Sequence, residues 1–167
     1  MGGREHIYAS TIVWTGDLGT GTSGYRSYSR AHEVRHPEKA TIAGSSDAAF
    51  RGDPSRWNPE DLLVASLAEC HMLSFLHLAA DAGVCVRGYV DRAVGVMREG
   101  SDGGGHFESV TLRPAVTVAG EVSAESLHAL HDKAHQLCFI ASSVNFPVGH
   151  EPSVSTVLPV GAASELP

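Results

Sequence analysis

The sequence predicts a single α+β domain with the element order β-β-β-α-β-β-α-β. Its 167 residues fit one ordinary domain, and nothing in the sequence requires a second one. Hydrophobic residues make up 43% of the chain and charged residues 19%, which is typical of a globular protein. Runs with strand composition alternate with only two segments that carry helix start and stop signals. We expect one domain over residues 1–167, with frayed ends at 1–5 and 160–167.

Three strand-like runs open the chain and are separated by segments that contain glycine or proline. They are His6–Trp14, Arg26–His36 and Lys39–Ala43. The simplest arrangement of three consecutive strands is an antiparallel β-meander. The GTGTSG segment between the first two runs lacks the Lys-Ser/Thr ending of a phosphate-binding loop. We therefore expect a turn there and no nucleotide site.

A long helix is predicted to begin at Pro59 and to stop at Gly83. Asn58 can cap it, Pro59 suits the first helical position, and Gly83 can end it. The acidic residues Glu60 and Asp61 stand at the positive end of the helix dipole. Apolar side chains cover most of the circumference, so we expect this helix to be buried nearly all round.

The second half of the chain is predicted to contain two long strands, a helix and a last strand. The strand-like runs Val84–Arg98 and His106–Val118 flank the segment EGSDGGG, whose glycines and polar residues predict a hairpin turn. Ser123 is expected to cap a second helix that runs through Leu137. The segment PVGHEP should break the chain before a last strand, Ser153–Leu158.

Charge and hydropathy argue against two classes of partner. The chain has 12 basic and 19 acidic residues, a net charge of −7, and its basic residues are not clustered, so a nucleic-acid backbone would be repelled. The most apolar stretch, Leu62–Ala80, is interrupted by Glu69, His71 and His77. The first residues lack the apolar run of a signal peptide. We therefore expect a cytoplasmic protein that binds neither nucleic acid nor membranes.

The chain has three cysteines, an odd number that argues against a static disulfide framework in a reducing compartment. Cys70 lies in the middle of the first predicted helix, and Cys138 ends the second one. Helices that pack 8–10 Å apart can bring two such thiols within disulfide range, so a redox pair is geometrically feasible. Cys85 alternates along a predicted strand with no titratable neighbour, and we expect it to pack in the core.

The second predicted helix also carries a stripe of potential metal ligands. His128, His131, His135 and Cys138 are spaced so that all four fall on one helical face. Four such positions span about 15 Å on a straight helix, so at most two neighbours could share one metal ion. This span favours a partly solvated histidine face, and a metal or haem site using His131, His135 and Cys138 stays open as an alternative.

Two sequence motifs resemble the signature of the OsmC/Ohr family of peroxide-reducing proteins. NPEDLLVASLAECHML, followed by LHLAADAGV, is similar to the first motif of that family, and AHQLCFIASSVNFPV is similar to the second. The resemblance extends from Trp14 to Leu158 and includes the order of the elements. It implies an OsmC-like fold, in which the helix that begins at Pro59 packs with its symmetry mate inside wrapping sheets. The expected assembly is an intertwined homodimer.

The resemblance implies a thiol-dependent reductase of organic hydroperoxides that needs no cofactor. Cys70 then corresponds to the peroxidatic cysteine of the family and Cys138 to the resolving cysteine. An external dithiol, such as a lipoyl group, would reduce the resulting disulfide. The apolar neighbours of the cysteines could form an apolar wall that favours an organic peroxide: Met72, Leu73, Phe75, Phe139, Ile140 and Phe146. Glu69 stands where the family usually has a small residue, and a non-catalytic dimer that binds an apolar small molecule is the other alternative.

The resemblance also implies a carboxylate and an arginine at the site. Glu60, in the NPE sequence, corresponds to the family's carboxylate, which holds an arginine that contacts the reactive thiolate. The family pattern favours Arg51 for this role, with Arg26 and Arg56 as alternatives. Glu60 and Cys70 are ten residues apart, about 15 Å along one helix, so a side chain has to bridge them. The planar, permanently charged guanidinium suits two anions at once.

Overall fold

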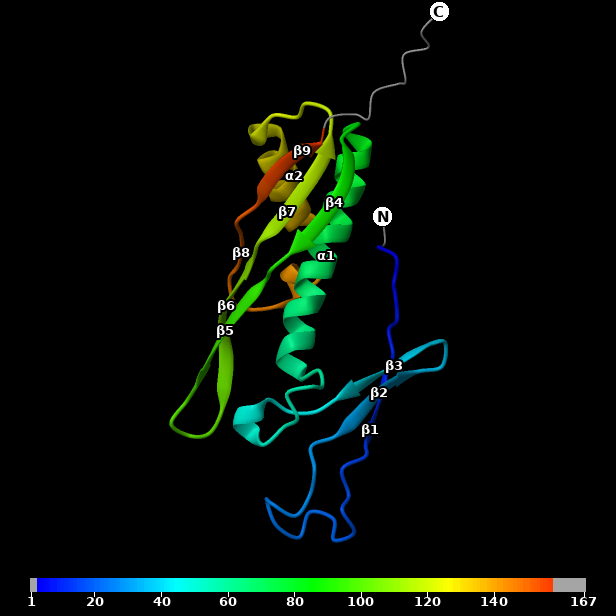
Figure 1. The fold of residues 1–167 in the computed structure, drawn as a ribbon, viewed down its shortest axis with the longest axis vertical. Coiled ribbons are helices and arrows are strands. Elements are labelled where there is room, and N and C mark those ends of the chain that lie inside the picture. The colour runs from blue at the N-terminus through cyan, green and yellow to red at the C-terminus, as the bar shows by residue number, and fades with distance from the viewer. Residues whose placement is uncertain (1–2, 158–167) are drawn as a thin grey trace, which may run out of the picture. The chain divides into compact units, whose positions relative to one another are not determined.

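A computed structural model describes residues 3–157 of the chain. The chain forms two compact units, which we call the N-terminal unit (residues 1–63) and the C-terminal unit (residues 64–167). Helices and strands follow one another as an α+β fold, as predicted (Figure 1). Residues 3–5 belong to no helix or strand, and the predicted frayed end at 160–167 lies outside the described residues. That the whole chain forms one domain stays a prediction.

The N-terminal unit holds a three-stranded antiparallel sheet in the order β1-β2-β3. Its strands are β1 (Thr11–Trp14), β2 (His32–His36) and β3 (Lys39–Gly44). The predicted β-meander is therefore confirmed. The first two strands are shorter than predicted, since residues 6–10 and 26–31 lie outside them. A short 3-10 helix, η1 (Ala48–Phe50), follows β3.

Side chains fold the connection between β1 and β2 into a loop instead of longer strands. The Asp17 carboxylate accepts a 2.8 Å hydrogen bond from the backbone N–H of Gly19, which closes a turn at the glycine-rich segment. Further along, the Arg30 guanidinium lies over the rings of Tyr25 and Tyr28, 4.3 and 4.2 Å from their centroids. It also donates hydrogen bonds to both tyrosine carbonyl oxygens. These local bonds compete with extended strand pairing.

Helix α1 (Pro59–Asp81) begins as its sequence predicts and ends at the predicted place. The Asn58 side chain accepts a 2.7 Å hydrogen bond from the backbone N–H of Asp61 and so caps the first turn. Past the last turn, Gly83 adopts a φ of +72°, a left-handed conformation that favours glycine. Both ends of this helix are thus fixed by local signals.

Only one side of α1 is fully buried within a single chain. The buried positions follow each other at intervals of four residues: Leu67, His71, Phe75 and Ala79. Leu73, on another side, is 63% exposed. The predicted burial on nearly all sides is therefore not reached by one chain alone. With a mean hydropathy of 1.6, α1 is long and apolar enough to cross a membrane, but core helices of soluble proteins also meet these criteria.

The C-terminal unit contains two three-stranded sheets. The first has the order β4-β7-β9, with strands β4 (Cys85–Asp91), β7 (Pro114–Ala119) and β9 (Ser153–Val157). The second has the order β5-β6-β8, with strands β5 (Val94–Glu99), β6 (Gly105–Leu112) and β8 (Val148–His150). In each sheet the first pair of strands is antiparallel and the second pair is parallel.

The strand boundaries correct the prediction in two places. The run Val84–Arg98, predicted as one strand, forms β4 and β5, and the run His106–Val118 forms β6 and β7. The segment predicted only to break the chain contributes β8. The last strand is confirmed through Val157, and its predicted end at Leu158 lies outside the described residues.

The break between β4 and β5 and the break between β6 and β7 lie side by side in the C-terminal unit. There, the backbone N–H of Arg92 donates to the carbonyl of Arg113, and that of Glu151 donates to the carbonyl of Leu112. Pro114 and Pro152 follow directly after Arg113 and Glu151 and have no N–H to continue a strand ladder. The apolar pattern of the sequence continues through both breaks and does not reveal them. The sequence therefore predicts a single strand in each case.

Helices α1 and α2 (Ala124–Leu137) pack on one face of the β4-β7-β9 sheet (Figure 1). Ser123 caps α2 as predicted, since its hydroxyl accepts a 3.1 Å hydrogen bond from the backbone N–H of Ser126. The shared core consists of Phe75, Ala79, Val116, Val118, Leu127 and Ala134. A second cluster of Leu67, Val110 and Leu112 packs the middle of α1 on β6. The two helices that carry Cys70 and Cys138 thus share one core.

Candidate active site

Cys70 and Cys138 come together in the C-terminal unit. Cys70 lies in the middle of α1 and is half-buried, whereas Cys138 is the residue that ends α2 and is 1% exposed. The two side chains are close enough for Cys70 to raise the pKa of Cys138, and both thiols are free. A redox pair on two packed helices was the arrangement that the sequence made feasible. The structure therefore places the two predicted cysteines next to each other.

A tight turn after α2 holds the sulfur of Cys138. The backbone N–H of Ala141 donates to Cys138 Sγ at 3.4 Å. Ser142 donates to the carbonyl of Cys138 from its backbone N–H, at 3.1 Å, and from its hydroxyl, at 3.0 Å. The turn continues into a 3-10 helix, η2 (Ala141–Ser143). Because several bonds fix the backbone around it, Cys138 has little freedom to turn away from Cys70.

Cys138 is held as a neutral thiol. Burial raises the pKa of the Cys138 thiol to about 11, and the hydrogen bond and negative charge of Cys70 act in the same direction. The N–H groups of Ile140 and Ala141 oppose this rise without cancelling it. At neutral pH Cys138 therefore keeps its proton and can donate it to the neighbouring sulfur. This is the state expected of a thiol that acts second.

The predicted carboxylate and the candidate arginines belong to the N-terminal unit. Glu60 is in the first turn of α1. Arg51 directly follows η1, Arg26 lies in the loop between β1 and β2, and Arg56 forms an ion pair with Asp53 at 3.5 Å. The approach of any of these side chains to the cysteines stays a prediction.

Arg51 has an unusual backbone conformation. Its φ of +66° is the only positive φ at a non-glycine residue among residues 3–157. Residues other than glycine, asparagine and aspartate rarely adopt this left-handed backbone conformation. Residues strained in this way cluster at functional sites. This conformation distinguishes Arg51 from Arg26 and Arg56.

Next to the cysteines, two buried histidines join α1 to α2. His71 Nε2 and His131 Nδ1 are 2.9 Å apart, and the planes of the two rings differ by 4°. His71 is 0% and His131 1% exposed. Burial lowers the pKa of His71 to about 4 and that of His131 to about 3, and the charge of neighbouring histidines adds to the effect. Both rings are therefore neutral at neutral pH.

Further imidazoles surround this pair to form a histidine cluster of His71, His131, His135 and His150. The ring of His150, from β8, lies 5.5 Å from those of His71 and His135 between centroids. His150 Nε2 also contacts the Asp132 carboxylate at 3.0 Å. Nδ1 of His71 and Nδ1 of His135 are buried without a hydrogen-bond partner among the described residues.

The metal or haem alternative is not supported by this arrangement. Within residues 3–157, no three His, Cys, Asp or Glu side chains are grouped so that they could hold a metal ion. The physical reason is that the predicted ligands face different partners, because His131 shares a hydrogen bond with His71 and Cys138 lies against Cys70. His131 and Cys138 thus contact α1, whereas His128 of the same stripe is exposed.

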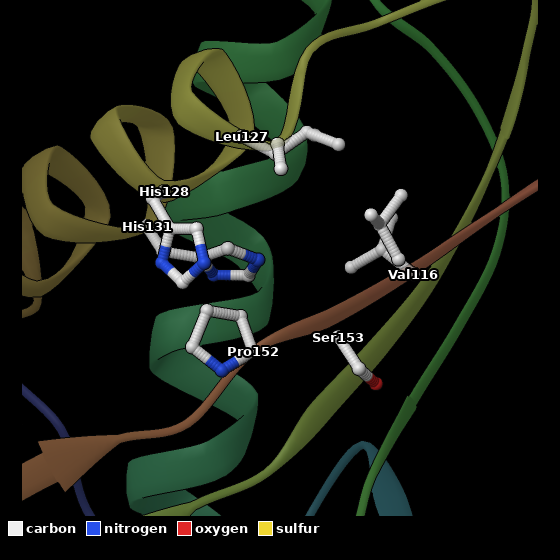
Figure 2. A pocket seen from close by; sticks show the side chains of 8 residues that line it. Val116, Leu127, His128, His131, Pro152 and Ser153 are labelled. Atoms are coloured by element: carbon white, nitrogen blue, oxygen red, sulfur yellow. The ribbon is translucent and has the colours of Figure 1, made fainter.

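A small cavity opens beside the histidines, between α2 and β9. Its lining residues are Val116, Ala124, Leu127, His128, His131, Pro152, Ser153 and Val154. Figure 2 shows the imidazoles of His128 and His131 on the side of α2, and Pro152 and Ser153 on the side of the strand. The cavity has about 240 Å³ of empty space, part of it open to solvent. The part of this space that is wide enough for solvent has room for only about one or two water molecules, so we assign the cavity no ligand.

Other residues near the cysteines differ from, or refine, the sequence expectations. Cys85 is exposed on β4, so the prediction that it packs in the core is wrong. Its neighbour Val86 packs inward, and side chains alternate along a strand. Glu69 is exposed, and Phe139, expected to line an apolar wall, is 82% exposed. Phe75, from the same expected wall, lies in the core instead.

Sequence reasoning did not predict that His71 and His150 belong to the histidine cluster. A signal for His71 exists, because it falls in the stripe Leu67, His71, Phe75 and Ala79 at intervals of four residues. A polar residue in a buried stripe requires a partner, and His131 on the inner face of α2 is a suitable one. No comparable signal marks His150, since its position depends on the pairing of β8 with β6.

Comparisons with known proteins agree with this architecture. A family model described as OsmC-like protein matches residues 52–152. The structure is similar to that of an OsmC-like protein of unknown function from Vibrio cholerae, with a TM-score of 0.80 and 31% sequence identity over 89% of this chain and 99% of that one. No curated protein sequence is similar enough to count as a match.

Two more distant structures share the fold. An organic hydroperoxide resistance protein from Elizabethkingia anophelis has a TM-score of 0.65 at 18% identity, covering 92% of this chain and all of that one (100%). The organic hydroperoxide resistance protein OsmC from Legionella pneumophila has a TM-score of 0.61 at 16% identity, covering 90% and 99%. The family model covers more than half of the chain, and the Vibrio protein exceeds 30% identity. This chain therefore belongs to the family of OsmC-like proteins.

Proposed function

We propose that this protein is a thiol-dependent reductase of organic hydroperoxides that uses Cys70 as the peroxidatic cysteine and Cys138 as the resolving cysteine. The observation that carries the proposal is that the two thiols interact, since Cys70 raises the pKa of Cys138 and both lie on helices that share one core. Family membership supports a peroxide-related role in general. The contact between the thiols supports a mechanism that passes through an intramolecular disulfide.

The first step oxidises Cys70. Its thiolate attacks the distal oxygen of the hydroperoxide, an S–O bond forms, and the O–O bond breaks. The departing oxygen takes a proton and leaves as an alcohol, so the peroxide is reduced by two electrons. Cys70 becomes a sulfenic acid.

The second step consumes the neutral thiol of Cys138. Cys138 gives up its proton as its sulfur attacks the sulfenic sulfur of Cys70, an S–S bond forms, and the S–O bond breaks. The thiol proton leaves with the hydroxyl group as water. The raised pKa of Cys138 suits this order, because a neutral thiol does not compete with Cys70 for the peroxide.

Glu60 and Arg51 complete the proposed site. The Arg51 guanidinium would stabilise the thiolate of Cys70, and Glu60 would hold the guanidinium in place. The left-handed backbone of Arg51 supports this choice over Arg26 and Arg56. No cofactor is needed for either step.

Partners and compartment follow from the same chemistry. An external dithiol, such as a lipoyl group, would attack the disulfide and return both cysteines to thiols, which suits the reducing cytoplasm. We also propose a homodimer, because α1 leaves apolar side chains such as Leu73 exposed in one chain. Exposed Val94 and Val96 on β5 add to the apolar surface that a second copy would cover.

The direct test measures consumption of cumene hydroperoxide with dihydrolipoamide as the reductant. Cys70→Ser should abolish turnover, and Cys85→Ser should leave it unchanged, because Cys85 lies outside the proposed site. Undiminished turnover by Cys70→Ser contradicts the proposal.

Intact mass separates this mechanism from a non-catalytic dimer that merely binds an apolar molecule. One equivalent of peroxide should remove about 2 Da from the wild-type chain, the loss expected for one disulfide. In Cys138→Ser the mass should instead rise by about 16 Da, the addition expected for a sulfenic acid. An unchanged mass in both proteins would favour the non-catalytic dimer.

A further inference from the structure

The hydrogen bond between His71 and His131 crosses the interface of the two helices that carry the cysteines. His71 directly follows Cys70 on α1, and His131 lies two turns before Cys138 on α2. The bond is 2.9 Å long, both side chains are almost fully buried, and the ring planes are nearly parallel. A buried bond with one fixed geometry determines how far one helix can slide along the other.

Only one arrangement of protons suits the surroundings of the pair. Nδ1 of His71 is buried without a partner among the described residues, and a buried N–H without an acceptor is less favourable than an unused lone pair. His71 therefore carries its proton on Nε2 and donates it to Nδ1 of His131. His131 then carries its own proton on Nε2, on the ring that lines the cavity in Figure 2.

The charged neighbours of the pair keep it neutral. Burial lowers the pKa of both rings, and the positive charges of His150 on β8 and of His135 and His128 on α2 act in the same direction. Asp132 on α2 opposes this effect at His131. A proton on Nδ1 of His131 would place two N–H groups opposite each other, so the bond requires that this nitrogen stays unprotonated.

Packing around the bond makes its geometry hard to change. The ring of His131 stacks on Phe75 of α1, with centroids 4.1 Å apart and planes at 12°. The bond and the stack lie on the buried stripe of α1, and Cys70 stands beside this stripe. On the side of α2, the turn after Cys138 fixes the second sulfur. The approach of the two sulfurs therefore depends on the position of one helix relative to the other.

We propose that His71 and His131 are positioning residues whose hydrogen bond fixes the register of α1 against α2 and so holds Cys70 and Cys138 within disulfide distance. This inference deepens the proposed function and rests on its cysteine pair, but it concerns the approach of the sulfurs and not the reaction with peroxide. Disulfide geometry tolerates little error, so a small shift of one helix reduces the tendency to form the bond.

The test measures the equilibrium between the cysteine pair and glutathione, in a Cys85→Ser background that removes the exposed thiol. One glutathione disulfide oxidises the two thiols, an S–S bond forms between Cys70 and Cys138, and two glutathione thiols are released. The ratio of disulfide to dithiol, read by intact mass after acid quenching, gives the effective concentration of one thiol at the other. No peroxide is involved.

Matched substitutions separate the hydrogen bond from simple packing. His131→Leu keeps the approximate volume but removes the bond, and it should lower the effective concentration about 10-fold, the effect of losing one buried hydrogen bond. His131→Asn, whose carbonyl can occupy the place of Nδ1, should restore most of it. His71→Gln, whose amide nitrogen can occupy the place of Nε2, should likewise restore most of the effective concentration that His71→Leu loses. His128→Gln, on the exposed side of α2, is the control and should equal the wild type.

Two results would overturn the inference. The first is a ratio of disulfide to dithiol in folded His131→Leu and His71→Leu that equals the wild-type ratio. The second is a wild-type chain that forms no disulfide when it is equilibrated with glutathione. If either leucine variant does not fold, as judged by circular dichroism, the asparagine and glutamine variants are compared with His131→Gln and His71→Asn. In His131→Gln and His71→Asn the amide does not reach the place of the nitrogen that makes the hydrogen bond. Both variants should therefore have a low effective concentration. A wild type that equilibrates with glutathione but ignores peroxide would contradict only the proposed function.

Discussion

The backbone N–H of Arg113, between β6 and β7, donates a 2.7 Å hydrogen bond to the carboxylate of Asp91, the last residue of β4. The second oxygen of Asp91 is buried without a hydrogen-bond partner among the described residues. Burial raises the pKa of Asp91, and the bond from Arg113 opposes the rise. The carboxylate is thus useful as an acceptor and unfavourable as a buried charge.

This double role predicts opposite effects for two substitutions at Asp91. Asp91→Asn keeps an oxygen that accepts the N–H of Arg113 and removes the charge, so stability at pH 7 should stay equal or rise. Asp91→Ala leaves that N–H without its partner and should cost about 1–3 kcal/mol. Urea unfolding followed by circular dichroism measures both. A loss of stability in Asp91→Asn as large as in Asp91→Ala would show that the charge itself is required.

The buried histidine pair predicts a loss of stability in acid. The pKa of His71 in the folded protein is about 4 and that of His131 about 3, below the ordinary value of 6.5. The unfolded chain therefore binds these protons first, and stability falls as pH drops from about 6.5 towards about 3. Each imidazole contributes a slope of up to about 1.4 kcal/mol per pH unit in this window.

Urea midpoints at pH 7, 5.5 and 4.5 would measure this slope. A double variant, His71→Phe with His131→Phe, keeps two aromatic rings in place and should show a smaller slope than the wild type. His6→Gln should keep the wild-type slope, because His6 is exposed and is not among the groups that shift the pKa of His71 or His131. Equal slopes in the wild type and the double variant would contradict the assignment of this acid sensitivity to the pair.

Cys85 and Cys138 should differ in their rate of reaction with iodoacetamide. Cys85 is exposed, whereas Cys138 is buried and its pKa is raised to about 11. Since the thiolate is the reacting form, Cys138 should be modified far more slowly than Cys85 at pH 8. Peptide mapping by mass spectrometry at successive times measures both rates. In 6 M urea the difference should disappear, and its persistence would rule out burial as the cause.

Local signals in the sequence predicted the parts of the fold that depend on a few neighbouring residues. Asn58, Gly83 and Ser123 mark helix ends because a cap acts on the turn beside it. The strand divisions beside Arg113 were missed, because the bonds that define them come from residues distant in sequence. The exposure of Cys85 also depends on which face of β4 is covered, which alternation alone does not reveal.

The candidate site was predictable in its cysteines and not in its histidines. Motif resemblance identified Cys70 and Cys138, and their contact is what two packed helices allow. The partner of His71 lies 60 residues away, and its identity depends on how α1 and α2 align. A histidine in an apolar helix signals only that some partner exists.

Arg51 should be the arginine whose loss impairs the proposed reaction with peroxide. A guanidinium beside an anion lowers the pKa of that anion by about 1–3 units, so its removal should reduce the reactive thiolate about 10-fold or more. Arg51→Gln should therefore slow the first step, measured as sulfenic acid formation in a Cys138→Ser background. Arg26→Gln and Arg56→Gln are matched controls. If either control is the impaired variant, the role passes to that arginine.

Gly95 tests how closely α1 packs on the β5-β6-β8 sheet. A Cβ added at Gly95, on β5, would lie 2.6 Å from the ring of Phe107 on β6 and 2.8 Å from a methyl carbon of Val64 on α1. Both neighbours pack against the buried cluster of Leu67, Val110 and Leu112. Gly95→Ala should therefore lower the free energy of unfolding by about 1–3 kcal/mol, the usual effect of overpacking.

Two glycines of the same unit serve as controls for Gly95. At Gly149, on β8, an added Cβ meets nothing within 4 Å, and at Gly88, on β4, it meets Thr117 at an ordinary 3.5 Å. Alanine at either position should change stability by less than about 0.5 kcal/mol or raise it slightly, since alanine restricts the unfolded chain. Urea unfolding of the three variants decides between a general effect of alanine in strands and a clash specific to Gly95. Equal losses at all three positions would mean that α1 does not approach the sheet this closely in solution.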